Sequence, residues 1–185
     1  AMSSAELQRE AAVSAGVITG MAAAGSLEMV LVSDEAAPPP PRLSGGPALS
    51  PDQTDAADAI GDMLGKGFGP VLLDGVTGSG KTEVYFDAVS RTIEAGRQVL
   101  ILLPEIALSA AWKQRFRDRF GVMPTEWHSD VAAGRKRRAW RHAQSGAAQV
   151  VVGARSALFL PFADLGLIIV DEEHEQAYKQ EDQVV

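Results

Sequence analysis

The 185-residue chain contains no cysteine, which excludes a disulfide framework and a thiolate metal site within this span. No apolar run approaches the roughly 20 residues that a membrane-spanning helix needs. The start of the chain has neither the basic segment nor the apolar core of a secretion signal. We therefore expect a cytoplasmic protein that has no membrane partner.

The chain also lacks an excess of positive charge. Its formal net charge is −7, which argues against a nucleic-acid binder driven by overall charge. A motor that grips nucleic acid through a local groove is still compatible with this charge. The hydrophobic share of 46% is ordinary for a globular chain and large enough for a core.

A proline-rich stretch, residues 36–48, marks a boundary between two parts of the chain. Its consecutive prolines lack backbone donors and favour an extended conformation, so we interpret the stretch as a linker. The alternative is an ordered proline-rich loop that packs on the main domain.

Residues 1–35, before this linker, contain too few residues to bury a core alone. Apolar spacing predicts a helix over 10–24, Gly25 is a plausible stop, and residues 27–32 follow as a strand. A helix, a glycine turn and a strand are how a winged-helix domain ends, so we expect the tail of such a domain. An N-terminal helical extension that packs on the main domain is an equal alternative.

Residues 49–185 alternate between strand-like and helix-like runs, which predicts an α/β fold with a parallel sheet and helices on both faces. The predicted strands are Val71–Asp74, Val99–Leu103, Thr125–His128, Gln149–Val152 and Leu167–Asp171. The predicted helices are Pro51–Leu64, Lys81–Ala95, Ile106–Phe120 and Gly134–Gln144.

A complete phosphate-binding loop, GVTGSGKT, lies between the first of these strands and the next helix. Glycines allow backbone N–H groups to approach phosphate oxygens at the positive end of a helix dipole. Lys81 is expected to reach the β- and γ-phosphates of ATP, and the Thr82 hydroxyl to ligate Mg²⁺. The predicted nucleotide-binding residues of the loop are Gly75, Thr77, Gly78, Ser79, Gly80, Lys81 and Thr82.

An acidic pair follows the last predicted strand and supplies the second half of an ATPase site. Asp171 is expected to hold Mg²⁺, and Glu172 to polarise the attacking water. His174, in a D-E-x-H arrangement, would lie beside the γ-phosphate and report nucleotide state; a plain surface histidine is the alternative. Strand ends at one sheet edge converge, so these residues are expected to meet the loop.

A capped helix start precedes the loop. Ser50 suits the N-cap and Pro51 the first helical position. The amide of Gln53 is able to bond both a donor and an acceptor on the adenine edge, although a solvent-facing glutamine is an even alternative.

Aromatic and basic residues elsewhere are expected to be structural. Trp112, Phe116 and Phe120 recur every four positions, as on the buried face of a helix, and Trp140 is also expected in the core. The basic cluster around residues 135–141 is interpreted as a solvated helix face in preference to a DNA contact.

From Leu49 onward, about three quarters of the chain resembles the first RecA-like lobe of the primosomal protein N′ (PriA) family of replication-restart helicases, in superfamily 2. The motifs that carry the resemblance are DGVTGSGKTEVY, LPEIAL, WHS, GARSALFLPF, and DEEH followed by YKQ. The GARSALF and DEEH–YKQ segments distinguish this family from the related RecG and transcription-repair coupling translocases.

The resemblance implies a 3′→5′ DNA helicase that hydrolyses ATP with Mg²⁺ and acts in replication restart and primosome assembly, in the bacterial cytoplasm near the nucleoid. It implies single-stranded and forked DNA, other restart proteins, single-strand-binding protein and a replicative helicase loader as partners. The DNA-contacting residues that it implies are Pro104, Glu105, Arg155, Ser156 and Tyr178.

The family also has a second RecA-like lobe with ATP-site arginines, and cysteine clusters that bind zinc. Neither is in this sequence, so we expect the 185 residues alone to bind nucleotide weakly and hardly turn it over. Other superfamily 2 translocases of the RecG or transcription-repair type, and a nucleotide-sensing binding module without translocation, are the alternative functions.

Overall fold

The computed structural model of the protein describes residues 4–28, 36–43, 46–76, 78–104 and 108–172. The chain divides into two compact units, residues 1–36 and 37–185. No helix among the described residues is long and apolar enough to cross a membrane.

The first unit contains two short helices, α1 (Ser4–Ala11) and α2 (Ala15–Ala23), so the prediction of one helix over 10–24 is wrong. The helical conformation is interrupted at Ala12, which has a φ of 50°. Ser14 then takes the extended N-cap conformation that serine favours before a helix. Gly25 ends α2 as predicted, with a φ of 72°. Leu27 and Glu28 are in no strand; residues 29–32 of the predicted strand lie outside the described residues.

A parallel four-stranded sheet forms the centre of the second unit, in the order β2-β3-β1-β4. Its strands are β1 (Gln98–Leu102), β2 (Thr125–Trp127), β3 (Val150–Gly153) and β4 (Leu165–Val170). All of β1 and β3 is buried, as their continuous apolar runs predict. The α/β fold with a parallel sheet is confirmed.

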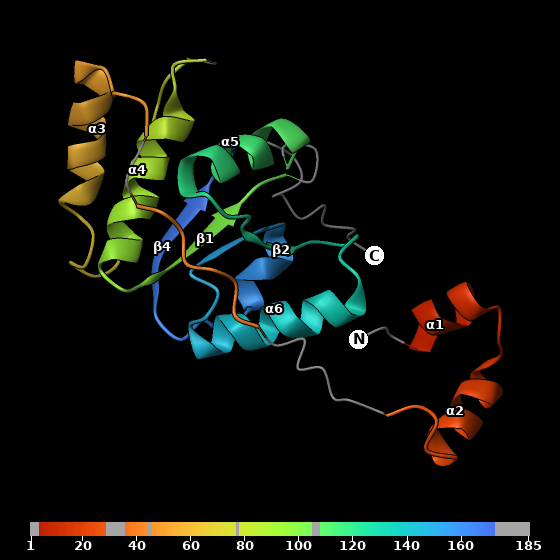
Figure 1. Cartoon of the computed structure of the whole chain (residues 1–185). Coiled ribbons are helices and arrows are strands. Elements are labelled where there is room, and N and C mark those ends of the chain that lie inside the picture. Colours follow the sequence, from red (N-terminus) through yellow and green to blue (C-terminus); the bar gives the residue numbers. More distant parts are fainter. Residues whose placement is uncertain (1–3, 29–35, 44–45, 77, 105–107, 173–185) are drawn as a thin grey trace, which may run out of the picture. The chain divides into compact units, whose positions relative to one another are not determined.

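Helices cover both faces of this sheet (Figure 1). The helices are α3 (Pro51–Gly61), α4 (Lys81–Glu94), α5 (Ala110–Phe120) and α6 (Ala133–Ser145), with the 3₁₀ helix η1 (Arg155–Phe159). On one face α4 and α5 pack around the fully buried Phe86 and Phe116. On the other face Ala143 of α6 and Ala157 of η1 pack against β1 and β3.

The α5 helix presents the aromatic face that the sequence predicts: Trp112, Phe116 and Phe120 are all buried. The helix begins at Ala110, later than predicted, because Ser109 caps it by accepting a hydrogen bond from the Trp112 backbone N–H at 3.3 Å. Residues 105–107, where the predicted helix begins, lie outside the described residues.

The predicted strand Val71–Asp74 is not a strand, and the sheet edge at β4 is formed without it. Leu72 is 78% exposed, and Ile168 and Val170 of β4 are each 46% exposed. The apolar run between Pro70 and Asp74 is short, and proline offers no backbone donor. Pairing of residues 71–74 with β4 would therefore bury little apolar surface and form few hydrogen bonds between the strands.

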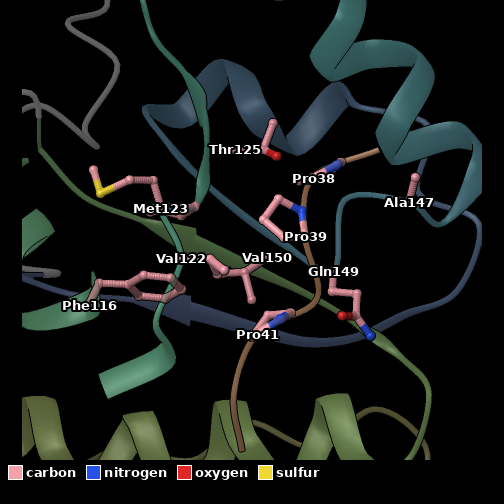
Figure 2. Close-up of a pocket in the computed structure, with 11 residues that line it drawn as sticks. Pro38, Pro39, Pro41, Phe116, Val122, Met123, Thr125, Ala147, Gln149 and Val150 are labelled. Atoms are coloured by element: carbon pink, nitrogen blue, oxygen red, sulfur yellow. The ribbon is translucent and has the colours of Figure 1, made fainter. Parts of the chain in front are cut away.

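Residues 37–43 of the proline-rich stretch belong to the second unit and pack within it. Pro38, Pro39 and Pro41 line a small cavity with Phe116 and Val150 (Figure 2). Its volume of about 20 Å³ holds about one water molecule, so it is a packing gap and not a ligand site. The Arg42 backbone N–H also donates to the Phe120 carbonyl at 2.7 Å. These contacts match the ordered loop that the sequence left as an alternative.

Candidate nucleotide-binding site

The phosphate-binding loop leads directly into α4. Gly78 and Gly80 have φ angles of 82° and 85°, in the left-handed region that glycine adopts without strain. Gly80 is the N-cap of α4, so Lys81 and Thr82 begin the helix at its positive dipole end. Thr77 lies outside the described residues. The described part of the loop therefore has the glycine conformations expected of an anion cradle.

Lys81 folds back over this loop. Its ammonium group donates to the carbonyl oxygens of Gly75 and Val76, the latter at 3.5 Å. A cation is thus held above the glycine-rich turn, where phosphate oxygens would compete with these carbonyls for it.

Gln53 joins the start of α3 to the loop. Its Oε1 accepts from the Ser50 backbone N–H at 2.9 Å while Ser50 Oγ accepts from the Gln53 N–H at 3.3 Å, a complete capping box. Its Nε2 donates to the Ser79 carbonyl at 2.9 Å. A Cβ on Gly80 would lie 2.4 Å from this Nε2, so the contact itself requires glycine there.

The predicted cap at Ser50 is therefore present, and the amide of Gln53 is placed beside the phosphate loop instead of facing solvent. Both of its polar atoms are engaged within the chain in this conformation. Adenine recognition by Gln53 stays a prediction.

Tyr85 links the loop helix to the acidic strand end. Its hydroxyl donates to Asp171 Oδ2 at 2.9 Å and accepts from Trp112 Nε1–H at 2.8 Å, and Thr82 lies one helical turn before it on α4. Burial, followed by the negative charge of Asp171, raises the pKa of Tyr85 well above its ordinary value. The phenol therefore stays a donor over the physiological pH range.

Asp171 follows β4, and its backbone N–H donates to the Leu102 carbonyl at 3.1 Å. Its Oδ1 accepts from the backbone N–H of Glu172 at 3.0 Å. Glu172 has a φ of 54°, an uncommon conformation for a residue with a side chain, and it is exposed. The backbone thus turns sharply at the acidic pair. His174 lies outside the described residues.

The oxygen donors at this edge fit a magnesium ion that binds together with a nucleotide. Asp171 accepts from the Tyr85 hydroxyl, and Thr82 lies one turn from Tyr85 on the same helix, so the loop end and the acidic strand end are neighbours. Among the described residues no three acidic or histidine side chains cluster as an all-protein metal site would require. Mg²⁺ in nucleotide sites is held by one or two carboxylates, water and the phosphates, which suits this donor set.

Sequence reasoning missed the linking role of Tyr85. A signal was available, since Thr82 and Tyr85 are three residues apart on one helix and therefore share a face. The contribution of Trp112 had no such signal, because its indole reaches the phenol only after α4 and α5 pack together.

The residues that the resemblance assigns to DNA lie partly within the described chain. Pro104 is buried after β1, whereas Arg155 and Ser156 are exposed in η1, directly after β3. Ala154 occupies the N-cap of η1, so Ser156 lies within its first turn. Glu105 and Tyr178 lie outside the described residues.

Residues 50–185 match the DEAD/DEAH box helicase family, and the chain belongs to this family. The parallel sheet, the phosphate loop and the acidic strand end are thus those of a RecA-like helicase domain.

Among curated proteins, the chain is similar to several named replication restart protein PriA. The one from Rickettsia typhi is 48% identical over 139 residues, which are 75% of this chain and 21% of the relative. The one from Haemophilus influenzae is 47% identical over 120 residues, 65% of this chain and 16% of the relative. The one from Bacillus subtilis is 43% identical over 135 residues, 72% and 17% respectively.

These comparisons confirm the resemblance to PriA that the motifs indicate. The chain spans about a fifth of the length of the first of these relatives.

Proposed function

We propose that this chain is the ATP-binding lobe of an ATP-dependent 3′→5′ DNA helicase that acts in replication restart and primosome assembly in the bacterial cytoplasm. The proposal is supported by membership of the helicase family and by the relatives named for replication restart. Single-stranded and forked DNA are the proposed substrates, and restart proteins, single-strand-binding protein and a helicase loader the proposed partners.

One structural observation carries the nucleotide-binding part of this proposal. The Tyr85 hydroxyl donates to Asp171 Oδ2, at the end of β4, at 2.9 Å, and Tyr85 lies one helical turn from Thr82 at the end of the phosphate loop. This arrangement supports the proposal that the phosphate loop and the acidic strand end, widely separated in sequence, form one site. Ligands in open α/β sheets gather at this carboxyl edge of the strands.

Each residue then has a distinct task. Lys81 would bind the β- and γ-phosphates in place of the loop carbonyls that it contacts here, and the loop N–H groups would donate to the same phosphate oxygens. Thr82 and Asp171 would hold Mg²⁺, which would neutralise phosphate charge. Glu172 orients the attacking water, and His174 reports the state of the γ-phosphate. Gln53 is assigned to the adenine edge, for which its amide would have to exchange the contacts with Ser50 and Ser79 that it makes here.

The DNA-binding part of the proposal assigns Pro104, Glu105, Arg155, Ser156 and Tyr178 to the nucleic acid. The exposed Arg155 and Ser156 suit contacts with backbone phosphates, which position a strand without reading its sequence. Such contacts are appropriate for a motor that acts at forks of any sequence.

The first test is a titration of the chain with a fluorescent ATP analogue and Mg²⁺. We expect saturable binding, and its loss in Lys81→Ala, with Lys66→Ala as a control because Lys66 is an exposed lysine outside the loop. Equal binding by wild type and Lys81→Ala would overturn the assignment of the loop.

The second test uses the full-length protein that carries this segment. We expect it to separate a forked duplex with a 3′ single-stranded tail, and Lys81→Ala to abolish the separation. Nucleotide binding without any strand separation would instead identify a nucleotide-sensing binding module.

A further inference from the structure

A groove lies between β2 and α6, apart from the nucleotide site. Trp127, Lys136, Arg137, Trp140 and Arg141 line it, and its volume is about 380 Å³. The two indole rings lie 6.2 Å apart, centroid to centroid, at 45°. Trp140 is 42% exposed, so the prediction that it belongs to the core is wrong.

The exposure of Trp140 follows from the register of α6. Ala139, His142 and Ala143 form the buried stripe of this helix, and Ala143 packs against the sheet. Trp140 lies beside that stripe and covers only part of Trp127, which is itself half-buried. An exposed aromatic patch bordered by charged side chains is typical of an interaction site.

The charge of α6 is opposite to that of the chain as a whole. The helix, AGRKRRAWRHAQS, has a dense set of lysine and arginine side chains and no acidic one, whereas the net charge of the chain is −7. Lys136, Arg137 and Arg141 project along the same side as Trp140 and border the groove. The local field therefore favours a polyanion.

One residue of the groove, Trp127, is hydrogen-bonded to the segment proposed to contact DNA. Trp127 ends β2, and its carbonyl accepts a 3.1 Å hydrogen bond from the Ala154 backbone N–H, directly before Arg155. Lys136 Nζ donates to the Ser129 carbonyl at 3.1 Å and so fixes the start of α6 to the turn after β2. The basic helix is thereby held beside the carboxyl edge of the sheet.

We propose that this groove binds single-stranded DNA, with an unpaired base stacked on Trp140 and with Lys136, Arg137 and Arg141 along the backbone phosphates. Single-stranded nucleic acid presents flat aromatic faces and phosphate charges along one polymer, and the groove has partners for both. An acidic peptide would satisfy the cations and leave the indoles uncovered. The inference rests on the proposed function, of which it names a further contact with the DNA strand.

The test is binding of a fluorescent oligothymidylate to the 185-residue chain without nucleotide, at several salt concentrations. We expect Trp140→Ala to weaken binding about tenfold and Trp140→Phe to restore most of it, since base–aromatic stacking tolerates either ring. Quenching of intrinsic tryptophan fluorescence by the oligonucleotide is expected to fall in Trp140→Phe. Thermal melting of each variant checks that the fold is kept.

The phosphate contacts are tested with a matched pair of arginines on one helix. Arg137 lines the groove and Arg135 does not, although both are exposed and carry the same charge. Arg137→Ala is expected to reduce the slope of log affinity against log salt by about 0.7, and Arg135→Ala to change it less.

The proposal for the groove would be overturned if Arg137→Ala and Arg135→Ala changed the salt dependence equally and Trp140→Ala left the affinity for the oligonucleotide unchanged. Competition by polyglutamate as strong as by oligothymidylate would also overturn it, in favour of an acidic peptide. The nucleotide titration on Lys81 tests the proposed function separately. If nucleotide binding is intact and the groove variants do not change oligonucleotide binding, only the proposal for the groove is rejected.

Discussion

The Tyr85 hydroxyl donates to Asp171 Oδ2 at 2.9 Å and joins residues that are 86 positions apart in the chain. The same hydroxyl accepts from Trp112 Nε1–H, so the helices α4 and α5 and the end of β4 meet at one oxygen. Tyr85 is only 6% exposed and Trp112 only 7%, so water cannot easily replace these bonds. The phenol thus fixes the position of the carboxylate proposed to hold Mg²⁺.

Tyr85→Phe is expected to weaken divalent-metal binding in the presence of nucleotide. The ring and its packing stay, but Asp171 loses the donor that orients it, and loss of such a supporting hydrogen bond typically costs about 10-fold or more in metal affinity. Electron paramagnetic resonance of Mn²⁺, titrated with a non-hydrolysable ATP analogue, measures this directly. The matched control is Val84→Ala. Val84 is the residue before Tyr85 on α4, and this change removes buried volume from the helix without removing a hydrogen bond to Asp171.

Tyr85→Phe is also expected to lower the free energy of unfolding by about 1–3 kcal/mol, because the buried Trp112 N–H loses its acceptor. A variant with lowered stability and unchanged Mn²⁺ affinity would mean that Tyr85 only supports the fold.

Gln53→Ala is expected to destabilise the protein by about 1 kcal/mol, since it removes one side of the capping box, and to weaken nucleotide binding because the Ser79 carbonyl loses its donor. Gln53→Glu separates the two effects: its carboxylate still accepts from the Ser50 N–H but no longer donates to Ser79. Chemical denaturation and analogue titration on both variants measure them. If nucleotide binding is weakened in Gln53→Ala but unchanged in Gln53→Glu, the role of the Ser79 contact is contradicted.

The sequence predicted those parts of the site that depend on local pattern. The loop, the helix from Lys81, the cap at Ser50 and the β4 strand are each encoded in a few adjacent residues. Contacts created by packing could not be predicted in this way, and the Trp112–Tyr85–Asp171 chain is the clearest example.

The errors have the same origin. Val71–Asp74 has the composition of a strand, yet strand formation depends on a partner edge and on burial that the local sequence does not specify. Trp140 has the composition of a core residue, yet the register of α6 turns it to the groove.

Gln98 is a buried polar residue whose hydrogen bonds form only when the chain folds. Gln98→Leu is expected to lower the free energy of unfolding by about 3 kcal/mol. Its Nε2 donates to the carbonyls of Ala143 and Ala148, and its Oε1 accepts from the N–H groups of Ala163 and Asp164. Leucine keeps the volume but removes all four of these hydrogen bonds; only the Ala163 N–H and the Ala143 carbonyl keep a bond to each other, at 3.2 Å. Urea denaturation measures the loss.

Gln144→Leu is the control for this substitution, because Gln144 is exposed on α6 and the same change there is expected to stay within about 0.5 kcal/mol. Similar losses in the two variants would show that the hydrogen bonds of Gln98 add nothing to stability.

His142 is expected to make the stability of the protein depend on mildly acidic pH. Burial, and then the positive charges of Arg138 and Arg141, lower the pKa of His142 below its ordinary value. Its Nε2 is buried without a hydrogen-bond partner in the described part of the chain. The folded state therefore holds the imidazole neutral and resists its protonation.

Because the folded-state pKa is the lower one, the contribution of His142 is fully present above the unfolded pKa, near 6.5, and is lost as pH falls through the folded value. His142→Leu removes the titrating group and keeps an apolar side chain in the stripe of α6. Melting temperatures measured from pH 8 to about pH 5 are expected to fall less steeply for this variant than for the wild type. Parallel curves would mean that protonation of His142 does not oppose folding.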